Sequence, residues 1–206
     1  IISGFDCIKL KLGAIDFEAE LKLLDQIRKI YNEREITIRV DANGAFKPGE
    51  ALEKLKRISD YQVHSIEQPI ATMQWESMAN LCRKSPLPIA LDEELIGPYN
   101  SFEKQNLIDL IKPQYLIIKP TLLGGFLESE TWIDLAEKAS VGWWITSALE
   151  SNIGLNAIAQ WTYQLGISMP QGLGTGSLFV NNFSSPLFIK KGCLGIDNSL
   201  PWNSII

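Results

Sequence analysis

Three carboxylates and one amine recur at an almost constant interval along this sequence. Asp41, Glu67, Asp92 and Lys119 each end a short apolar run, and they lie 26, 25 and 27 residues apart. Carboxylate oxygens gathered at one point suit Mg²⁺, which keeps its remaining coordination positions for water and substrate. Such an ion can stabilise the negative charge that develops when a proton next to a carboxylate is removed. The spacing therefore points to an active site.

Two further lysines lie upstream of the first acid. Lys9 and Lys11 are two residues apart in a predicted strand, so both side chains point to the same side. We expect Lys11 and Lys119 to face each other across one site. Positive charges placed close together disfavour the protonated form of an amine, and this would allow a lysine to act as a general base.

The interval between the acids matches one strand plus one returning helix. Repeats of that unit predict an α/β fold, either a parallel sheet or a barrel, with the carboxyl ends of the strands on one face. Strands are expected at 5–11, 36–41, 63–67, 88–92, 115–119, 141–146 and 169–173. Helices are expected at 17–31, 52–58, 75–82, 101–111, 124–139 and 154–165, and Asp16 is expected to cap the first.

The domain organisation predicted for these 206 residues is simple. No linker or low-complexity stretch divides the sequence, so residues 1–206 are expected to form a single domain. The tail from about 181 to 206 is rich in Ser, Asn, Gly and Pro and is expected to be irregular. A complete eight-unit barrel usually needs about 250 residues. Because the sequence also begins at Ile1, we expect it to be part of a longer polypeptide.

Composition excludes several classes of partner. A formal net charge of −5 leaves no basic surface for nucleic acid or anionic lipid. The apolar stretches are shorter than the roughly 18 residues that a membrane helix needs. Cys7, Cys82 and Cys193 lack the spacing of metal ligands and are expected to be reduced thiols, which favours a cytoplasmic protein.

Short segments in order along the chain carry a family resemblance. The sequence resembles the enolase superfamily, and its muconate-lactonizing branch, in Lys9–Lys11, Arg39–Gly44, Ile66–Pro69, Ala90–Glu93 and Ile118–Leu122. Ile118–Leu122, Ser147–Ser151 and Gly172–Thr175 are most similar to members that convert 2-succinyl-6-hydroxy-2,4-cyclohexadiene-1-carboxylate to 2-succinylbenzoate in menaquinone biosynthesis. The resemblance implies a TIM-like (β/α)7β barrel, here lacking its first strand and the N-terminal capping domain.

The resemblance also implies catalytic roles. Members of the superfamily use a lysine or histidine base together with Mg²⁺. The expected ligands of Mg²⁺, or of Mn²⁺ in its place, are Asp41, Glu67 and Asp92. Lys11 would remove the proton alpha to the carboxylate of a small substrate and return it to the departing hydroxyl. Lys119 would stay cationic against the enolate, and Lys9 would tune Lys11.

Further residues are implied to support the substrate and the metal ligands. Thr146, Ser147 and Gly172 would contact the succinyl tail of the substrate, in part through backbone groups. Arg39 and Asn43 share the face of Asp41 and would support it from behind.

Two other functions stay open. The same branch contains racemases and epimerases of N-acylated amino acids or dipeptides, which would use Lys11 and Lys119 as bases on opposite faces. The third possibility is a barrel fragment that binds a metal or a partner without catalysis. A barrel that lacks its first strand would have unpaired strand edges, and such edges recruit other strands. We therefore expect either the capping region or self-association to complete the site.

Overall fold

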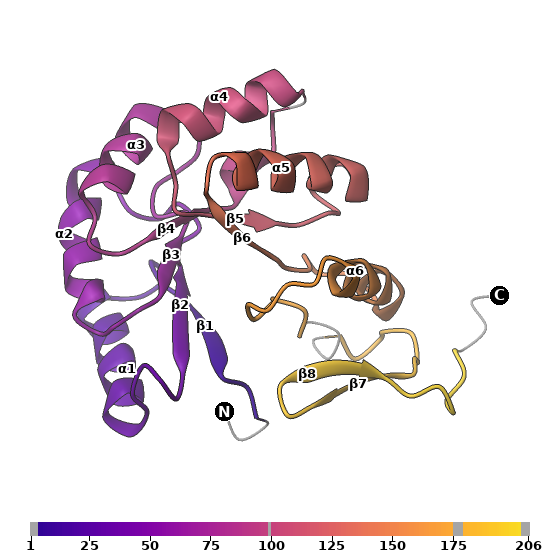
Figure 1. Ribbon diagram of the computed structural model, residues 1–206. Helices are drawn as coiled ribbons and strands as arrows, with labels where there is room; N and C mark the ends of the chain where they lie inside the picture. Colours follow the sequence, from indigo (N-terminus) through magenta and orange to yellow (C-terminus); the bar gives the residue numbers. More distant parts are fainter. Residues whose placement is uncertain (1–3, 99, 175–178, 203–206) are drawn as a thin grey trace. The chain divides into compact units, whose positions relative to one another are not determined.

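The computed structural model describes residues 4–98, 100–174 and 179–202 (Figure 1). The chain divides into two compact units. The larger unit comprises Asp6–Ile117 and Thr131–Trp143. The smaller unit comprises Ile1–Phe5, Ile118–Glu130 and Trp144–Ile206. Thr175, the last residue of the sequence resemblance, lies outside the described residues.

A six-stranded sheet runs through the chain in sequential order, from β1 to β6. Its strands are β1 (Cys7–Lys11), β2 (Thr37–Asp41), β3 (Ser65–Glu67), β4 (Ile89–Leu91), β5 (Tyr115–Ile118) and β6 (Gly142–Ile145). Neighbouring strands from β1 to β5 pair in parallel. Parallel neighbours in sequential order are the product of repeated strand-helix units, and this confirms the predicted α/β class.

All six expected helices are present. They are α1 (Phe17–Ile30), α2 (Pro48–Ser59), α3 (Trp75–Lys84), α4 (Ser101–Ile111), α5 (Phe126–Lys138) and α6 (Asn152–Gln164), with a short 3₁₀ helix η1 (Glu93–Leu95). Asp16 caps α1 as predicted, because its Oδ2 accepts from the backbone N–H of Ala19 at 3.1 Å. No helix among the described residues is long and apolar enough to cross a membrane.

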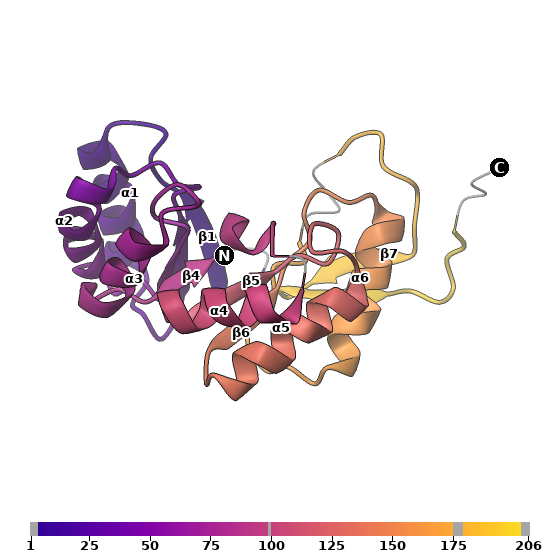
Figure 2. The same ribbon diagram turned by 90° about the horizontal axis from the view of Figure 1, so that it is seen from above.

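The core of the larger unit lies between its helices and one side of its strands. Figure 2 shows α1, α2 and α3 side by side along these strands. Leu24, Leu55 and Met78 of the helices are fully buried, as are Ile38 and Ile66 of the strands. Burial of one such side chain contributes about 1.5–3 kcal/mol. Because strand side chains alternate, this packing leaves the opposite side for the polar residues of the strands.

The prediction of a strand at 169–173 is wrong. Only an isolated parallel bridge forms there, between Thr146 and Gly172. The Gln171 side chain explains the interruption, because its Oε1 accepts the N–H of Ile145 at 2.6 Å in place of a backbone carbonyl. A side chain that takes a ladder position stops the regular pairing of backbone groups.

The sequence predicted an irregular tail from about residue 181 to 206, but part of this tail is regular. Strands β7 (Leu187–Lys190) and β8 (Cys193–Ile196) form an antiparallel hairpin. The two residues that join them, Lys191 and Gly192, have φ values of 52° and 73°. Two consecutive positive φ values are typical of the tight turns whose twist matches that of the flanking strands.

Candidate active site

Strand register brings the predicted metal ligands and Lys11, which all belong to the larger unit, to one edge of the sheet. Lys11 pairs with Asp41, and Asp41 pairs with Glu67, in the parallel ladder. Asp92 follows directly after β4, whose Ala90 pairs with Glu67. Lys11, Asp41, Glu67 and Asp92 therefore all stand at the carboxyl ends of adjacent strands, where the parallel folds place their active sites.

The three carboxylates are removed from solvent. Asp41, Glu67 and Asp92 are exposed by only 0%, 2% and 2%. Burial, together with the negative charges of Asp41 and Asp92, raises the pKa of Glu67 to about 8 against the opposing charge of Lys9. Burial also disfavours ionisation of Asp41, but Lys9 and Lys11 outweigh it and hold the pKa of Asp41 at about 2. Such a row of buried acids requires cations beside it.

Two ammonium groups supply that charge. Lys9 Nζ donates to Asp41 Oδ2 at 2.9 Å and to the two Glu67 oxygens at 3.1 and 3.0 Å. Burial lowers the pKa of Lys9, but the charges of Glu67 and Asp41 overcome this and leave its pKa raised. Lys11 Nζ donates to Asp41 Oδ2 at 2.5 Å. The Lys11 side chain is 58% exposed, against 38% for Lys9, so Lys11 is the more accessible to a substrate.

Asn43 links the first and fourth strand ends. Its backbone N–H donates to Asp41 Oδ1 at 2.9 Å, and its Oδ1 accepts from Lys11 Nζ at 2.6 Å. Its amide nitrogen donates to Glu93 Oε1 at 2.8 Å. Asn43 has a φ of 42°, a conformation that asparagine tolerates better than most residues. Its amide therefore holds the end of the Lys11 side chain.

Arg39 lies two residues before Asp41 on the same side of β2. It is buried, and this burial lowers the pKa of its guanidinium. The charges of Cys7, Tyr115 and Glu67 act in the opposite direction. Arg39 thus lies near enough to Glu67 for their charges to interact, and its role in supporting Asp41 stays a prediction.

The carboxylate groups of Asp41, Glu67 and Asp92 are chemically suited to bind a hard divalent cation. Carboxylate oxygens are the ligands that Mg²⁺ prefers, and these acids lie side by side and buried. Within the described residues, no group of three or more His, Cys, Asp or Glu side chains is arranged to hold a metal ion as it stands. Lys9 accounts for part of this, because its ammonium contacts the oxygens of Asp41 and Glu67 that a cation would need.

Sequence reasoning gave no role to several carboxylates and amides around these strand ends. Glu93 holds Asn43, while Gln68 and Glu94 are buried behind Asp92. Glu20 of α1 is also buried, and its Oε1 accepts the N–H groups of Gly13, Ala14 and Ile15 in the turn that follows Lys11. Only the position of Glu93, Glu94 and Gln68 next to predicted ligands could have indicated them.

The remaining predicted residues belong to the smaller unit. Lys119 directly follows Ile118, whose carbonyl accepts the N–H of Thr146 at 3.0 Å. Ser147 donates from its backbone N–H to the carbonyl of Gly172 at 3.1 Å. A Cβ on Gly172 would lie 2.7 Å from Thr146 Cβ, so this close approach requires glycine. The structure thus brings Thr146, Ser147 and Gly172 together.

The segment after Lys119 is tied to the segment after Ser147. The Thr121 hydroxyl donates to Glu150 Oε1, and the same oxygen accepts the N–H of Ala148 at 2.9 Å. Glu150 was quoted in the sequence resemblance but received no role there. Its carboxylate holds the two turns of the smaller unit that carry predicted site residues.

Known proteins share this arrangement of strands. Residues 1–196 match the family described as enolase C-terminal domain-like. The chain belongs to this family. Its fold is therefore the TIM-like barrel of enolase C-terminal domains, as the resemblance had predicted.

Members of the enolase C-terminal family include close relatives of this chain. It is 54% identical over 196 residues to an o-succinylbenzoate synthase of Desulfotalea psychrophila, covering 95% of this chain and 53% of that protein. It is 34% identical over 152 residues to an N-succinylamino acid racemase of Thermus thermophilus, covering 73% of this chain and 38% of that protein. The chain thus spans about half the length, or less, of these relatives.

Solved structures with the enolase C-terminal fold are also similar to the structure of this chain. The MenC crystal structure from Desulfotalea psychrophila matches with a TM-score of 0.90 and 53% identity, over 95% of this chain and 54% of that one. Muconate cycloisomerase from Pseudomonas fluorescens matches with a TM-score of 0.84 and 25% identity, over 93% of this chain and 53% of that one.

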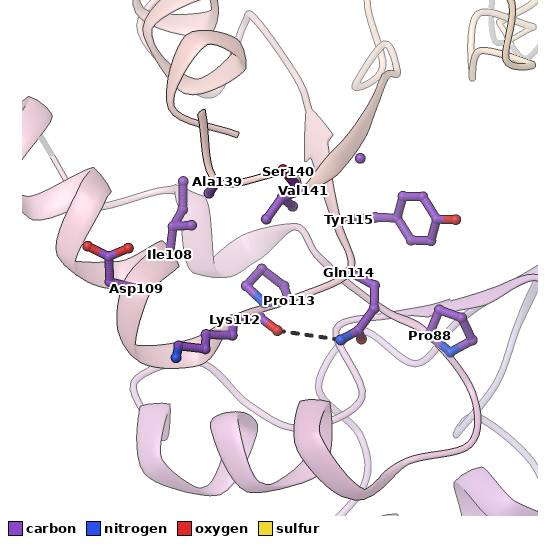
Figure 3. A pocket seen from close by; sticks show the side chains of 11 residues that line it. Pro88, Ile108, Asp109, Lys112, Pro113, Gln114, Tyr115, Ala139, Ser140 and Val141 are labelled. Atoms are coloured by element: carbon purple, nitrogen blue, oxygen red, sulfur yellow. Dashed lines mark hydrogen bonds between the residues drawn. The ribbon is translucent and has the colours of Figure 1, made fainter. Parts of the chain in front are cut away.

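A cavity of about 680 Å³ lies at the amino ends of strands β4, β5 and β6, opposite the carboxyl ends that carry the candidate site (Figure 3). It is lined by residues that precede or begin β4, β5 and β6 and by the end of α4, including Pro88, Lys112, Gln114 and Val141. None of the predicted site residues lines it. In these barrels the amino ends of the strands serve stability, whereas the carboxyl ends carry the chemistry.

The raised pKa of Glu67 predicts how the stability of the metal-free protein depends on pH. The pKa of about 8 lies above the ordinary 4.5, so the folded state holds this proton more tightly than the unfolded chain does. The resulting stabilisation is complete below the ordinary pKa and is lost as the pH rises through about 8. Urea unfolding in the presence of a chelator should therefore show stability falling across this range, less so in Glu67→Gln. An equal slope in both proteins would contradict the assignment to Glu67.

Proposed function

We propose that this protein is an o-succinylbenzoate synthase, a carbon-oxygen lyase of menaquinone biosynthesis. It would convert 2-succinyl-6-hydroxy-2,4-cyclohexadiene-1-carboxylate to 2-succinylbenzoate and water. The observation that carries the proposal is the row of Asp41, Glu67 and Asp92 beside the exposed Lys11 at adjacent strand ends. The 54% identity to a protein of that name supports the choice of substrate.

The cofactor of the proposed reaction is Mg²⁺, or Mn²⁺ in its place, held by Asp41, Glu67 and Asp92. When bound, the ion would supply positive charge at the substrate carboxylate, where deprotonation adds a second negative charge. The carboxylates fit this role because they are buried and adjacent. Lys9 would retain part of its contact with Asp41 and Glu67 and keep the site close to charge balance.

Lys11 would perform both proton transfers. As the neutral amine it takes the proton alpha to the carboxylate, and the electron pair of that C–H bond moves into the carboxylate. The pair then returns to form the ring double bond as the C–O bond to the hydroxyl breaks. The same proton passes from Lys11 to the departing hydroxyl, which leaves as water. Asn43 would hold Lys11 in place, since its amide oxygen lies 2.6 Å from Nζ.

Residues of the smaller unit would act on the rest of the substrate. Lys119 would stay cationic against the face of the developing enolate. The backbone groups around Thr146, Ser147 and Gly172 would receive the succinyl tail. We also propose a cytoplasmic location, in keeping with free thiols at all three cysteines among the described residues.

A racemase of N-succinylated amino acids is the second candidate. The 34% identity to such an enzyme of Thermus thermophilus and the presence of both Lys11 and Lys119 favour it. The two reactions place different demands on Lys119, because racemisation requires it to exchange a proton, whereas dehydration requires only its positive charge.

Lys119→Arg should separate the two candidates. Arginine keeps the charge but does not release its proton at neutral pH, so we expect dehydration to persist and racemisation to disappear. Loss of absorbance from the cyclohexadiene substrate measures the first reaction, and polarimetry with N-succinylated amino acids measures the second. Equal loss of both activities would show that the role given to Lys119 is wrong.

We further propose that a capping region, or a second copy of this chain, completes the site. A wet site weakens each electrostatic contribution to catalysis. Because unpaired strand edges recruit other strands, residues 1–206 alone should self-associate in sizing chromatography. Because their site would be wet, they should dehydrate the substrate slowly. Adding the N-terminal half of the Desulfotalea psychrophila relative as a separate chain should raise the rate. A monomer with unchanged activity after this addition would refute the proposal.

A further inference from the structure

Glu94 is a buried carboxylate that the proposed chemistry does not use. It is 4% exposed and lies two residues after Asp92. Its Oε1 accepts from the backbone N–H of Met73 at 2.8 Å and from Trp75 Nε1 at 2.6 Å. Its Oε2 accepts from Gln68 Nε2 at 3.0 Å. A carboxylate so deeply buried is expensive unless its hydrogen bonds are fixed, and these donors fix it.

Gln68 connects Glu94 to the backbone of Asp92. The side chain is 1% exposed, and its amide nitrogen also donates to the carbonyl of Ile70 at 3.1 Å. Its amide oxygen accepts the N–H groups of Asp92 and Glu94 at 3.3 and 3.4 Å. An ionised carboxylate can only accept, so Glu94 decides which end of the Gln68 amide faces it. The oxygen is then left to face the backbone at Asp92.

The Asp92 backbone needs such a partner. Strand β4 ends at Leu91 and the 3₁₀ helix begins at Glu93, so Asp92 lies between two elements with φ −124° and ψ −84°. Gln68 directly follows Glu67, the neighbouring carboxylate, and has itself a φ of 38°. One amide side chain therefore fixes the spacing between two adjacent acids of the site.

We propose that Glu94, acting through Gln68, is a positioning residue that sets the place of the Asp92 carboxylate and hence the affinity of the site for a divalent cation. Trp75 and the backbone of Met73 hold Glu94 in the orientation that this requires. The inference rests on the proposed function only in taking Asp92 as a ligand of the cation. It adds a role to residues that contact neither substrate nor metal.

The test compares Glu94→Gln with a matched control, Glu76→Gln, in the protein titrated with Mn²⁺. Both variants lose one negative charge and keep the side-chain shape, but Glu76 is exposed on α3. In Glu94→Gln one accepting oxygen becomes a donor that opposes another N–H, so the amide of Gln68 loses its fixed orientation. Residues behind metal ligands typically contribute about 10- to 100-fold in metal affinity. We expect Glu94→Gln to weaken Mn²⁺ binding by that factor and Glu76→Gln to change it less than about twofold.

The free Mn²⁺ signal in electron paramagnetic resonance gives the affinity, and circular dichroism with thermal unfolding gives the folded fraction. If Glu94→Gln does not fold, Trp75→Phe removes one donor to Glu94 and should weaken Mn²⁺ binding by a smaller factor. A folded Glu94→Gln or Trp75→Phe variant with unchanged affinity would overturn the positioning role. Failure of the unmodified protein to bind Mn²⁺ at all would instead overturn the proposed metal site.

Discussion

Lys11→Ala is expected to lower the rate of dehydration by about 10² to 10⁴-fold, because general acid-base catalysis is typically worth that factor. The loss should lie towards the upper end, since one amine would serve both proton transfers. The fold should persist, because the Lys11 side chain is largely exposed. The rate at saturating substrate and metal measures the effect.

The control for Lys11→Ala is Lys22→Ala, which removes an exposed lysine from α1. It should leave the rate unchanged. A Lys11→Ala protein that keeps more than about a tenth of the activity would assign the base to another residue. Lys9 would then be the next residue to replace, because it lies on the same side of β1 and contacts the same Asp41.

Glu67→Gln is expected to reduce affinity for Mg²⁺ by more than about 100-fold, since even residues behind metal ligands contribute about 10- to 100-fold. Glu67 is the middle carboxylate, paired through the ladder with Asp41 and influenced by the charge of Asp92. Its neutral replacement would keep one amide oxygen but remove the negative charge between the outer acids. Calorimetric titration with Mg²⁺ measures the loss.

A matched control for Glu67→Gln is Glu53→Gln, a charge removal on the exposed side of α2. Its affinity for Mg²⁺ should equal that of the unmodified protein. If Glu67→Gln binds Mg²⁺ as tightly as the control does, the carboxylates of these strand ends do not form the metal site.

Much of the fold follows from local patterns in the sequence. The helix at Ser101–Ile111 was expected with the bounds that it has, because Pro113 marks its end. The hairpin of β7 and β8 was missed, because its strands Leu187–Lys190 and Cys193–Ile196 are short and show no alternation of apolar and polar residues. The strand at 169–173 failed for another reason, since a side chain of Gln171 replaces a backbone partner.

The candidate site was predictable only in part. Regular spacing of strand ends suffices to place Asp41 beside Glu67, because parallel pairing in sequential order fixes the register. The position of the Lys9 ammonium between these acids depends on side-chain conformation, which spacing does not encode. The buried pair of Gln68 and Glu94 was hidden for the same reason. That Lys11 and Lys119 face each other stays a prediction.

Lys11 is proposed to remove the proton alpha to the substrate carboxylate, while a divalent cation held by Asp41, Glu67 and Asp92 would stabilise the charge that develops there. The most direct test of this claim is dehydration of 2-succinyl-6-hydroxy-2,4-cyclohexadiene-1-carboxylate by metal-depleted protein, followed by addition of Mg²⁺ with Lys11→Ala measured in parallel. We predict that activity is absent after depletion, returns with Mg²⁺ in the unmodified protein and does not return in Lys11→Ala. Turnover that survives depletion, or that Mg²⁺ restores equally in both proteins, would contradict the claim.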